Sequence, residues 1–277
     1  MTREDTSPSP APAASRGAHP TASRGALPTA LRIAEIAERL RTRRPRIHVL
    51  TSPVAQTFTA NMLLAIGAEP SMTTSPEEVP AFVAAADGLL INLGMLDRVR
   101  RDASLTAIEV AKDAGVPWVL DPVKIEVSPP RLDFARRLIE LEPALVHANR
   151  AEFLGLSGIE AAESAVRDYA VHTLSTLVVT GEVDIVTDGS HLVRVDNGHP
   201  LMDRVTAMGC AATAIATAFR AVEPDPILAA TAALVAVGVA GEMAAASAAG
   251  PGTFAVEIVD ALYALDAETL TERARIR

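Results

Sequence analysis

Short apolar segments alternate with helical segments along most of this chain, and this alternation limits the folds that are open to it. The apolar segments lie at residues 47–50, 88–92, 117–120, 144–147 and 176–180. Helical patterns separate them, near residues 53–66, 76–86, 97–114, 131–141 and 160–172. Strands that are apolar on both faces and are separated by helices predict an α/β fold, with a mainly parallel central sheet, right-handed crossovers and helices on both faces.

The later strand-like segments follow a different pattern. Residues 177–180, 184–187 and 192–196 are close together in sequence, with a turn at Asp188-Gly189. This spacing predicts antiparallel strands at one edge of the sheet. Three alanine-rich helices are expected after them, near residues 209–222, 226–246 and 253–265.

Local signals mark two helix boundaries. Ser75-Pro76-Glu77-Glu78 predicts a helix start, with a capping box and proline at the first helical position. Gly115, followed by Pro117, predicts the end of the helix before it. The spacing of Leu31, Ile36 and Leu40 predicts a first helix near residues 28–43.

Composition limits the domain organisation and the partners. Residues 1–28 are dominated by Ala, Pro, Ser, Thr and Gly and predict a disordered tail, and we expect residues 29–277 to form a single domain. The formal net charge of −9 argues against nucleic acid or an anionic membrane surface as the main partner. The single cysteine excludes an internal disulfide and fits a reducing cytoplasm. The most apolar run, residues 227–240, is too short to span a membrane and predicts a buried helix.

That cysteine, Cys210, follows Gly209 at the expected start of an alanine-rich helix. The first turn of a helix has N–H groups without intrahelical partners, and together with the helix dipole they favour negative charge. We therefore expect the pKa of the Cys210 thiol to fall below about 8.5. Cys210 is then a candidate base or nucleophile beside a phosphate, although a lone cysteine can also be a small buried apolar residue.

Polar side chains gather where the expected strands end, which is where ligands bind in open α/β sheets. They are Asn92, Asp121, Asn149 with Glu152, and Thr180. Asp121 and Glu152 suit Mg²⁺, which prefers oxygen ligands and often reaches them through water. Each residue alone could serve as a loop or cap residue. Together with the helix start at Cys210, they favour a site for phosphoryl transfer.

Several longer motifs occur in a fixed order. They are Thr51-Ser52-Pro53-Val54, Phe58-Thr59-Ala60-Asn61, Asn92-Leu93-Gly94, Asp121-Pro122-Val123, Asn149-Arg150-Ala151-Glu152, Asn197-Gly198-His199-Pro200-Leu201-Met202 and Gly250-Pro251-Gly252. In these motifs the chain resembles the hydroxyethylthiazole kinases of thiamine salvage, which have a ribokinase-like fold. The resemblance covers about residues 47–266. It implies transfer of the ATP γ-phosphate to the primary alcohol of 4-methyl-5-(2-hydroxyethyl)thiazole, a requirement for Mg²⁺, and a homotrimer with active sites between subunits.

The resemblance also implies residue roles. Met72 is similar to the thiazole-contacting methionine of the family, Arg131 to the arginine that contacts the ATP phosphates, and Thr180 to the nucleotide-binding threonine. Cys210 takes the place of the family cysteine, where related sugar kinases have an aspartate base. Asp121 and Glu152 fall in motifs near the Mg²⁺–phosphate region.

Two segments depart from the family pattern. The family's Gly-Thr-Gly-Cys is here Ala207-Met208-Gly209-Cys210, so Ala207 takes a glycine's place beside the substrate. If that position needs a positive φ, alanine costs about 1–2 kcal/mol there. The glycine-rich loop expected after Asp121-Pro122-Val123 is here residues 124–130, which we expect to be stiffer and more charged. Two alternatives therefore stay open: a kinase of another small heterocyclic alcohol, and a ligand-binding relative with weak catalysis.

Overall fold

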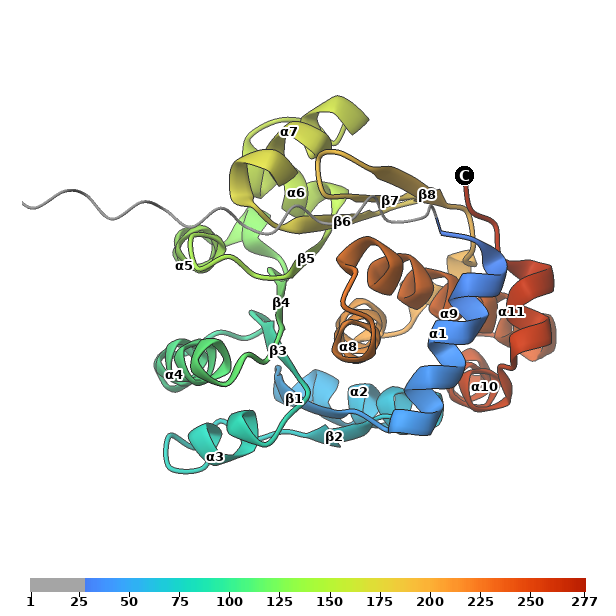
Figure 1. Ribbon diagram of the computed structural model, residues 1–277, viewed down its shortest axis with the longest axis horizontal. Helices are drawn as coiled ribbons and strands as arrows, with labels where there is room; N and C mark the ends of the chain where they lie inside the picture. Colours follow the sequence, from blue (N-terminus) through green and yellow to red (C-terminus); the bar gives the residue numbers. More distant parts are fainter. Residues whose placement is uncertain (1–27) are drawn as a thin grey trace, which may run out of the picture.

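An eight-stranded sheet runs through the structure, a computed structural model that describes residues 28–277 (Figure 1). Its strand order is β2-β1-β3-β4-β5-β6-β7-β8. The strands are β1 Arg46–Leu50, β2 Glu69–Ser71, β3 Gly88–Asn92, β4 Trp118–Asp121, β5 Leu145–Asn149, β6 Thr176–Thr180, β7 Asp184–Thr187 and β8 Leu192–Val195. β1 to β6 are parallel, and β7 and β8 continue the sheet in antiparallel pairing. The mainly parallel sheet with an antiparallel edge is therefore confirmed.

Helices cover both faces of this sheet, as predicted (Figure 1). One layer contains α3 Val79–Ala84, α4 Arg98–Ala114, α5 Pro129–Ile139, α6 Arg150–Ser157 and α7 Glu163–Thr173. The other contains α1 Ala30–Arg43, α2 Pro53–Ile66, α8 Met208–Val222, α9 Pro226–Ser247, α10 Pro251–Ala264 and α11 Ala267–Arg273. The tail predicted at residues 1–28 lies, except for Pro28, outside the described residues.

The strands carry apolar side chains on both faces, which explains why the sheet needs both layers. All five residues of β3 are buried, with Leu90 facing the core under α8 and α9 and Leu89 facing the core under α4. Successive side chains of a strand point to opposite faces, so each strand contributes to both cores. The sheet's carboxyl edge is thereby held between two rigid layers.

The prediction of a buried apolar helix is confirmed by α9. This helix has 22 residues and is apolar and long enough to cross a membrane by composition and length alone, but 89% of its most apolar window is buried inside the protein. It is longer than the run from which it was predicted, because it continues through Glu242 to Ser247. A helix that is apolar on all sides, as α9 is, is stable when it is buried in the protein core.

One predicted helix start is wrong. α3 begins at Val79, and the Ser75 carbonyl accepts the N–H groups of Glu78 and Val79 in a turn before it. The Ser75 N–H donates to the Thr73 hydroxyl at 3.2 Å, and that hydroxyl donates to the Glu78 carboxylate at 2.6 Å, so the predicted capping box does not form. In contrast, Gly115 ends α4 with φ 69°, as its sequence context predicts.

The sequence reading missed β2, α6 and α11, which are short. α6 has a signal that could have found it, because Asn149 and Glu152 form a capping box at its start. β2 has three residues and contains Pro70, so nothing in its pattern distinguishes it from a loop.

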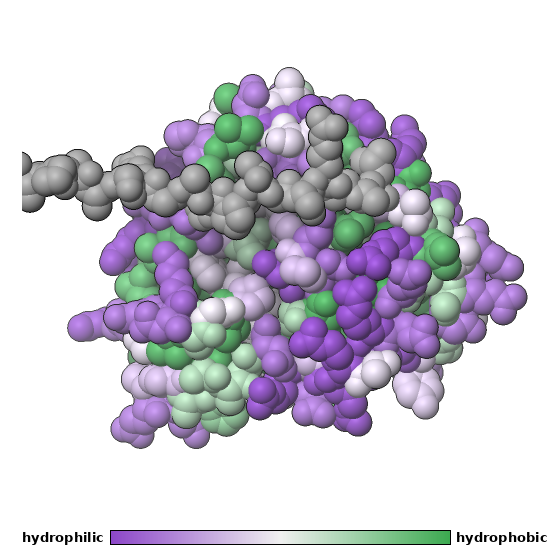
Figure 2. Space-filling model, viewed as in Figure 1, coloured by the Kyte–Doolittle hydropathy of each residue, from purple (hydrophilic) through white to green (hydrophobic). Residues whose placement is uncertain are grey.

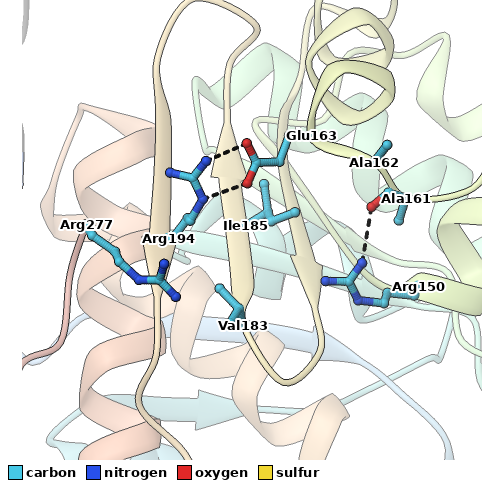
Figure 3. Close-up of a pocket in the computed structure, with 8 residues that line it drawn as sticks. All are labelled: Arg150, Ala161, Ala162, Glu163, Val183, Ile185, Arg194 and Arg277. Carbon is cyan, nitrogen blue, oxygen red and sulfur yellow. Dashed lines mark hydrogen bonds and ion pairs between the residues drawn. The ribbon is translucent and has the colours of Figure 1, made fainter.

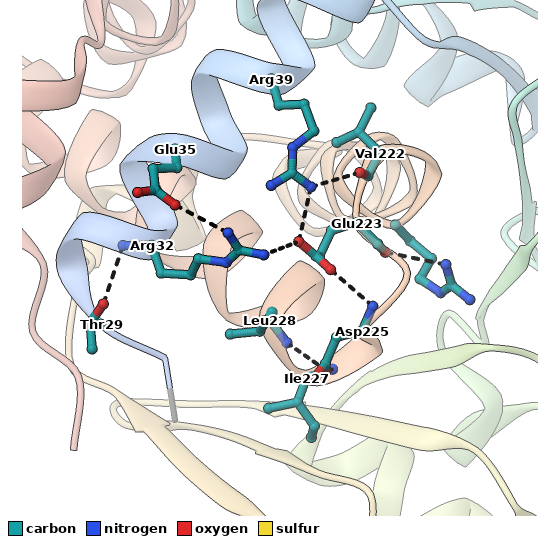
Figure 4. A network of polar contacts seen from close by, with 10 residues as sticks. Thr29, Arg32, Glu35, Arg39, Val222, Glu223, Asp225, Ile227 and Leu228 are labelled. Atoms are coloured by element: carbon teal, nitrogen blue, oxygen red, sulfur yellow. Dashed lines mark hydrogen bonds and ion pairs between the residues drawn. The ribbon is translucent and has the colours of Figure 1, made fainter. Parts of the chain in front are cut away.

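A buried carboxylate joins α1 to the turn between α8 and α9 (Figure 4). Glu223 is 3% exposed and accepts hydrogen bonds from Arg39 at 3.0 Å and from the N–H of Asp225 at 3.1 Å. Arg32 adds an ion pair at 3.5 Å. Asp225 in turn caps α9. The most hydrophilic band in Figure 2 lies over α1, and the hydrophobic side chains on that face form separate patches.

The Asn-Gly-His-Pro-Leu-Met motif packs against α9 after β8. Asn197 donates to Glu242 at 3.0 Å, and a Cβ on Gly238 would lie 2.6 Å from the Asn197 side chain, so glycine permits this close approach. Beyond it, Ile276 forms an antiparallel bridge with Val195 of β8. The motif and the last residues thus close the antiparallel edge of the sheet.

Candidate active site

The order of the strands creates a crevice at the carboxyl edge of the sheet. β1 is followed by the edge strand β2, and the chain then returns past β1 to β3 and continues toward β8. The loops after β1 and β3 therefore leave in opposite directions and open a crevice between them. Ligands usually bind in such a crevice in open α/β sheets. α8 packs on β1, β3 and β4 and begins beside this edge (Figure 1).

The residue before α8 has a left-handed backbone. Ala207 has φ 67° and ψ 8°, so the positive φ considered for this position is present in the structure. The turn lets α8 begin at Met208, and the N–H groups of Gly209 and Cys210 fall in its first turn, where no intrahelical carbonyl reaches them. Such a helix start favours an anionic group of a ligand.

Asp121, at the end of β4, is 5% exposed and held by several donors. Asn92 donates to its Oδ2 at 2.7 Å, and the Thr213 hydroxyl lies 3.2 Å from the same oxygen. Burial and the neighbouring Glu152 carboxylate raise the pKa of Asp121 to about 7, despite these hydrogen bonds. A positive charge next to Asp121 would favour its ionised form.

Glu152 is buried and has a structural role as well. Its Oε2 accepts the Asn149 N–H and its Oε1 accepts the Lys124 N–H, both at 2.9 Å. These bonds fix the carboxylate between α6 and the loop after β4. The described part of the chain holds no cluster of three or more His, Cys, Asp or Glu side chains suited to a metal ion. A cation at Asp121 and Glu152 would take its other ligands from water or from a substrate.

The low pKa expected for the Cys210 thiol is wrong. Burial, together with the nearby Asp121 and Glu152 carboxylates, raises the pKa of the Cys210 thiol to about 12. The helix start favours negative charge at Cys210, but desolvation and two neighbouring acids outweigh it. Cys210 therefore carries its proton at neutral pH.

A cavity of about 1180 Å³ opens at the first turn of α8, and we call it the α8 cavity. Its lining includes five of the seven residues to which the sequence analysis assigns a role, namely Asp121, Glu152, Thr180, Ala207 and Cys210. Gly209 also lines it, so the free amides, the acids and the threonine share one space. Apolar residues of α8 and α9 also line it, among them Ala212, Ala216, Ala230, Ala233 and Leu234.

Met72 and Arg131 are not among the residues that line the α8 cavity. Met72 follows β2, at the same edge of the sheet, and packs partly buried against the core that contains α8. Arg131 lies in the first turn of α5, and its Nη1 donates to the Val123 carbonyl at 2.6 Å, beside the Asp121 loop. The Arg131 Nε has no hydrogen-bond partner among the described residues.

The loop after β4 contains a short 3-10 helix at Ile125–Val127. Lys124 precedes it with a left-handed backbone, φ 56°, and lines the α8 cavity. Its side chain is 67% exposed, with Nζ 3.6 Å from Glu126. The ammonium group therefore lies in solvent at the cavity mouth.

Sequence reasoning missed two side chains of this site, His147 and Thr213. Thr213 lies within 3.0 Å of the His147 Nδ1 and 2.9 Å of the Gly209 carbonyl, besides its contact with Asp121. Burial lowers the pKa of His147 to about 4, so its ring is neutral. The spacing of Thr213 from Cys210, three residues along one helix face, is the signal that could have found it.

A second, smaller cleft of about 370 Å³ lies beside β7 and β8 (Figure 3). Its arginines have partners: Arg194 forms two hydrogen bonds to Glu163, Arg150 donates to the Ala161 carbonyl, and Arg277 pairs with Asp196. The charges of Arg194 and Arg277 are thus compensated by carboxylates, whereas Arg150 is bonded to a neutral carbonyl.

Comparisons with known proteins agree with this geometry. The profile of the hydroxyethylthiazole kinase family matches residues 37–268. The chain belongs to the hydroxyethylthiazole kinase family. A hydroxyethylthiazole kinase of Granulibacter bethesdensis is 45% identical over 249 residues, covering 85% of this chain and 91% of that protein. A probable hydroxyethylthiazole kinase of Agrobacterium fabrum is 46% identical and covers 88% of this chain and 94% of its own.

Solved structures agree on the fold. A hydroxyethylthiazole kinase protein from Pyrococcus horikoshii superposes with a TM-score of 0.85 at 37% identity, covering 88% of this chain and 98% of that one. A pyridoxal kinase from Staphylococcus aureus, at 15% identity and a TM-score of 0.56 over 72% of this chain and 88% of its own, shares the fold alone. The ribokinase-like fold predicted from the sequence is confirmed.

Proposed function

We propose that this protein transfers the γ-phosphate of ATP to the primary alcohol of 4-methyl-5-(2-hydroxyethyl)thiazole in thiamine salvage. The observation that carries the proposal is that the first-turn amides of α8, Asp121 and Thr180 share one cavity in a member of this family. Phosphoryl transfer depends mainly on positioning and on neutralising charge, and this arrangement offers both.

Mg²⁺ is the proposed cofactor, held by Asp121 and Glu152. The two acids fit it: both line the α8 cavity, and their mutual repulsion, which contributes to the raised pKa of Asp121, is relieved by a cation. Because Asp121 and Glu152 would supply only two carboxylates, most ligands of the ion would be water and phosphate oxygens, which is usual for Mg²⁺. When bound, Mg²⁺ would neutralise the phosphate charge.

The triphosphate is proposed to lie between the start of α8 and the loop after β4. The amides of Gly209 and Cys210 would bind the transferred phosphoryl group, with Thr180 contacting the nucleotide. Arg131 would contact the phosphates after a change of side-chain conformation, since its Nη1 now donates to Val123. Each of these roles is a prediction for mutagenesis.

The acceptor alcohol is proposed to lie between Cys210, Ala207 and Met72. With a pKa of about 12 the Cys210 thiol cannot accept the hydroxyl proton as an existing thiolate, so we assign it the placement of the hydroxyl oxygen.

A homotrimer in the cytoplasm is proposed as the working form. The apolar side chains of Val54 and Leu64 on α2 are 62% and 56% exposed, which suits a contact with another subunit. Light scattering of the purified protein tests this, and Leu64→Glu is expected to reduce the measured mass. A monomer mass for both the wild type and Leu64→Glu would contradict the proposed trimer.

One observation favours a second candidate, a kinase of another small heterocyclic alcohol. The Ala207 methyl group lines the cavity where the family pattern has glycine, so the space for the acceptor differs. ATP consumption measured with Mg²⁺ against a panel of small heterocyclic alcohols separates the two. Preference for the thiazole alcohol supports the main proposal, preference for another alcohol supports the second, and no turnover with any of them contradicts both.

A further inference from the structure

A buried histidine outside the α8 cavity is bonded to both residues that flank Met72. His48 lies in β1, is fully buried, and pairs in register with Ser71 of the edge strand β2. Its Nδ1 lies 2.8 Å from the Ser71 hydroxyl, and its Nε2 lies 3.2 Å from the Thr73 carbonyl. The Phe82 ring of α3 stacks on the imidazole with centroids 5.7 Å apart.

These contacts determine the hydrogen-bond direction at both ring nitrogens. The Thr73 carbonyl has no proton to give, so Nε2 carries the hydrogen and donates it. Burial lowers the pKa of His48, so the ring is neutral and Nδ1 is left as an acceptor for the Ser71 hydroxyl. One side chain thus holds one residue on each side of Met72.

The direction of Met72 follows from this clamp. Ile47 and Val49 of β1 contribute to the core that contains α8, so His48, between them, points to the opposite face. His48 binds Ser71 and Thr73 from the α3 face, while Met72 packs against the core on the α8 face. Fixing the backbone on both sides of Met72 therefore directs its thioether toward the face where α8 begins.

The segment itself is held by few other side-chain contacts. The Thr73 hydroxyl donates to Glu78 and accepts the Ser75 N–H, which ties the segment to the turn before α3. Residues 72–75 have no regular secondary structure. The bond from the His48 Nε2 to the Thr73 carbonyl connects this segment to β1, and the bond at Nδ1 adds to the β1–β2 pairing at Ser71.

We propose that His48 is a positioning residue that sets Met72 for binding of the azole ring of the acceptor alcohol, acting through Ser71 and Thr73. This inference rests on the proposed function, because the substrate contact of Met72 is part of it. His48 itself does not reach the α8 cavity and does not act on the reacting atoms.

Steady-state kinetics on the full chain test the proposal. His48→Phe keeps a flat ring beside Phe82 but removes both hydrogen bonds, and we expect the KM for the thiazole alcohol to rise at least tenfold while the KM for ATP stays within twofold. His48→Gln can place an amide N–H near the Thr73 carbonyl, so it should recover part of the loss. Equal rises of both KM values, or no rise, would overturn the inference.

Val49→Ala provides the matched control, since it is in the same strand and faces the other core. It should lower thermal stability without changing the ratio of the two KM values. A change of that ratio equal to the one in His48→Phe would assign the effect to general loss of packing and overturn the proposal.

A readout without turnover separates this inference from the proposed function. The methyl signal of Met72 in a ¹³C-methionine spectrum, assigned by Met72→Leu, should shift or broaden in His48→Phe, whereas that of buried Met208 should not. If the wild-type protein does not phosphorylate the thiazole alcohol, the proposed function fails, and the spectrum still decides on the clamp. An unchanged Met72 signal would refute the clamp itself.

Discussion

Ala207→Gly tests directly whether the turn before α8 stores strain. Ala207 has φ 67°, in a region where a Cβ costs about 1–2 kcal/mol and glycine costs nothing. Glycine loses more conformational freedom on folding, which costs about 0.5–1 kcal/mol relative to alanine. The relief of strain is the larger effect, so we expect a net stabilisation of about 0.5–1 kcal/mol.

Thermal unfolding measures this effect. For a domain of this size, about 1 kcal/mol corresponds to roughly 2–4 °C in Tm, so Ala207→Gly should raise Tm by about 1–4 °C. Ala221→Gly is the control, because Ala221 lies inside α8 without a positive φ, and the variant should lose about 1 kcal/mol of stability. If both variants lower Tm equally, the strain argument is refuted.

The same variant probes the acceptor side of the cavity. Removing the Ala207 methyl group enlarges the space beside Cys210, and kcat/KM for the thiazole alcohol should rise if that group obstructs the substrate. The neighbouring Met208 is 6% exposed and packs in the core, so changing it would combine a packing loss with any effect on the substrate. Ala207→Gly alone is therefore the cleaner experiment.

Three other variants test the electrostatics. Burial raises the pKa of Asp184 to about 6, above the usual 3.8. Its ionised form therefore destabilises the fold above pH 6, and this penalty disappears as the pH falls toward 4. Urea unfolding should show that Asp184→Asn adds about 1–2 kcal/mol to the free energy of unfolding at pH 8 and nothing at pH 4. Glu223→Ala should cost about 2–3 kcal/mol in the same assay, because it leaves Arg39 without its carboxylate; an unchanged midpoint would contradict that. Cys210→Ala should lower kcat more than tenfold while calorimetry still detects ATP binding, and full activity would remove Cys210 from the mechanism.

The sheet and its layers could be predicted because their signals are local. Alternating apolar strands and helices predict the parallel sheet, and Gly115 marks a helix end by its own backbone preference. The start of α3 could not be predicted, because Glu78 binds the Thr73 hydroxyl rather than completing the cap with Ser75. The Ser75 N–H donates to the Thr73 hydroxyl instead of the Glu78 carboxylate, and which of two nearby acceptors it takes is decided by geometry.

The sequence predicts which residues form the site better than it predicts their protonation states. Asp121, Thr180 and Cys210 lie in one cavity, as the order of strand ends predicts. The pKa of Cys210 was predicted with the wrong sign because the helix start is visible in the sequence, whereas the burial of the thiol beside Asp121 and Glu152 is not. Desolvation depends on contacts between residues that are far apart in the chain.

The topology explains why Met72 and the residues of the α8 cavity are separate in the structure. Met72 follows β2, on one side of the point where the chain reverses direction across the sheet, and Asp121 follows β4 on the other. An acceptor that bridges the crevice would contact both groups, with its ring toward β2 and its hydroxyl toward the start of α8. Positions near β2, such as His48, should therefore change acceptor binding, whereas positions near Asp121 should change phosphate transfer, because the two sides are carried by different strands of one rigid sheet.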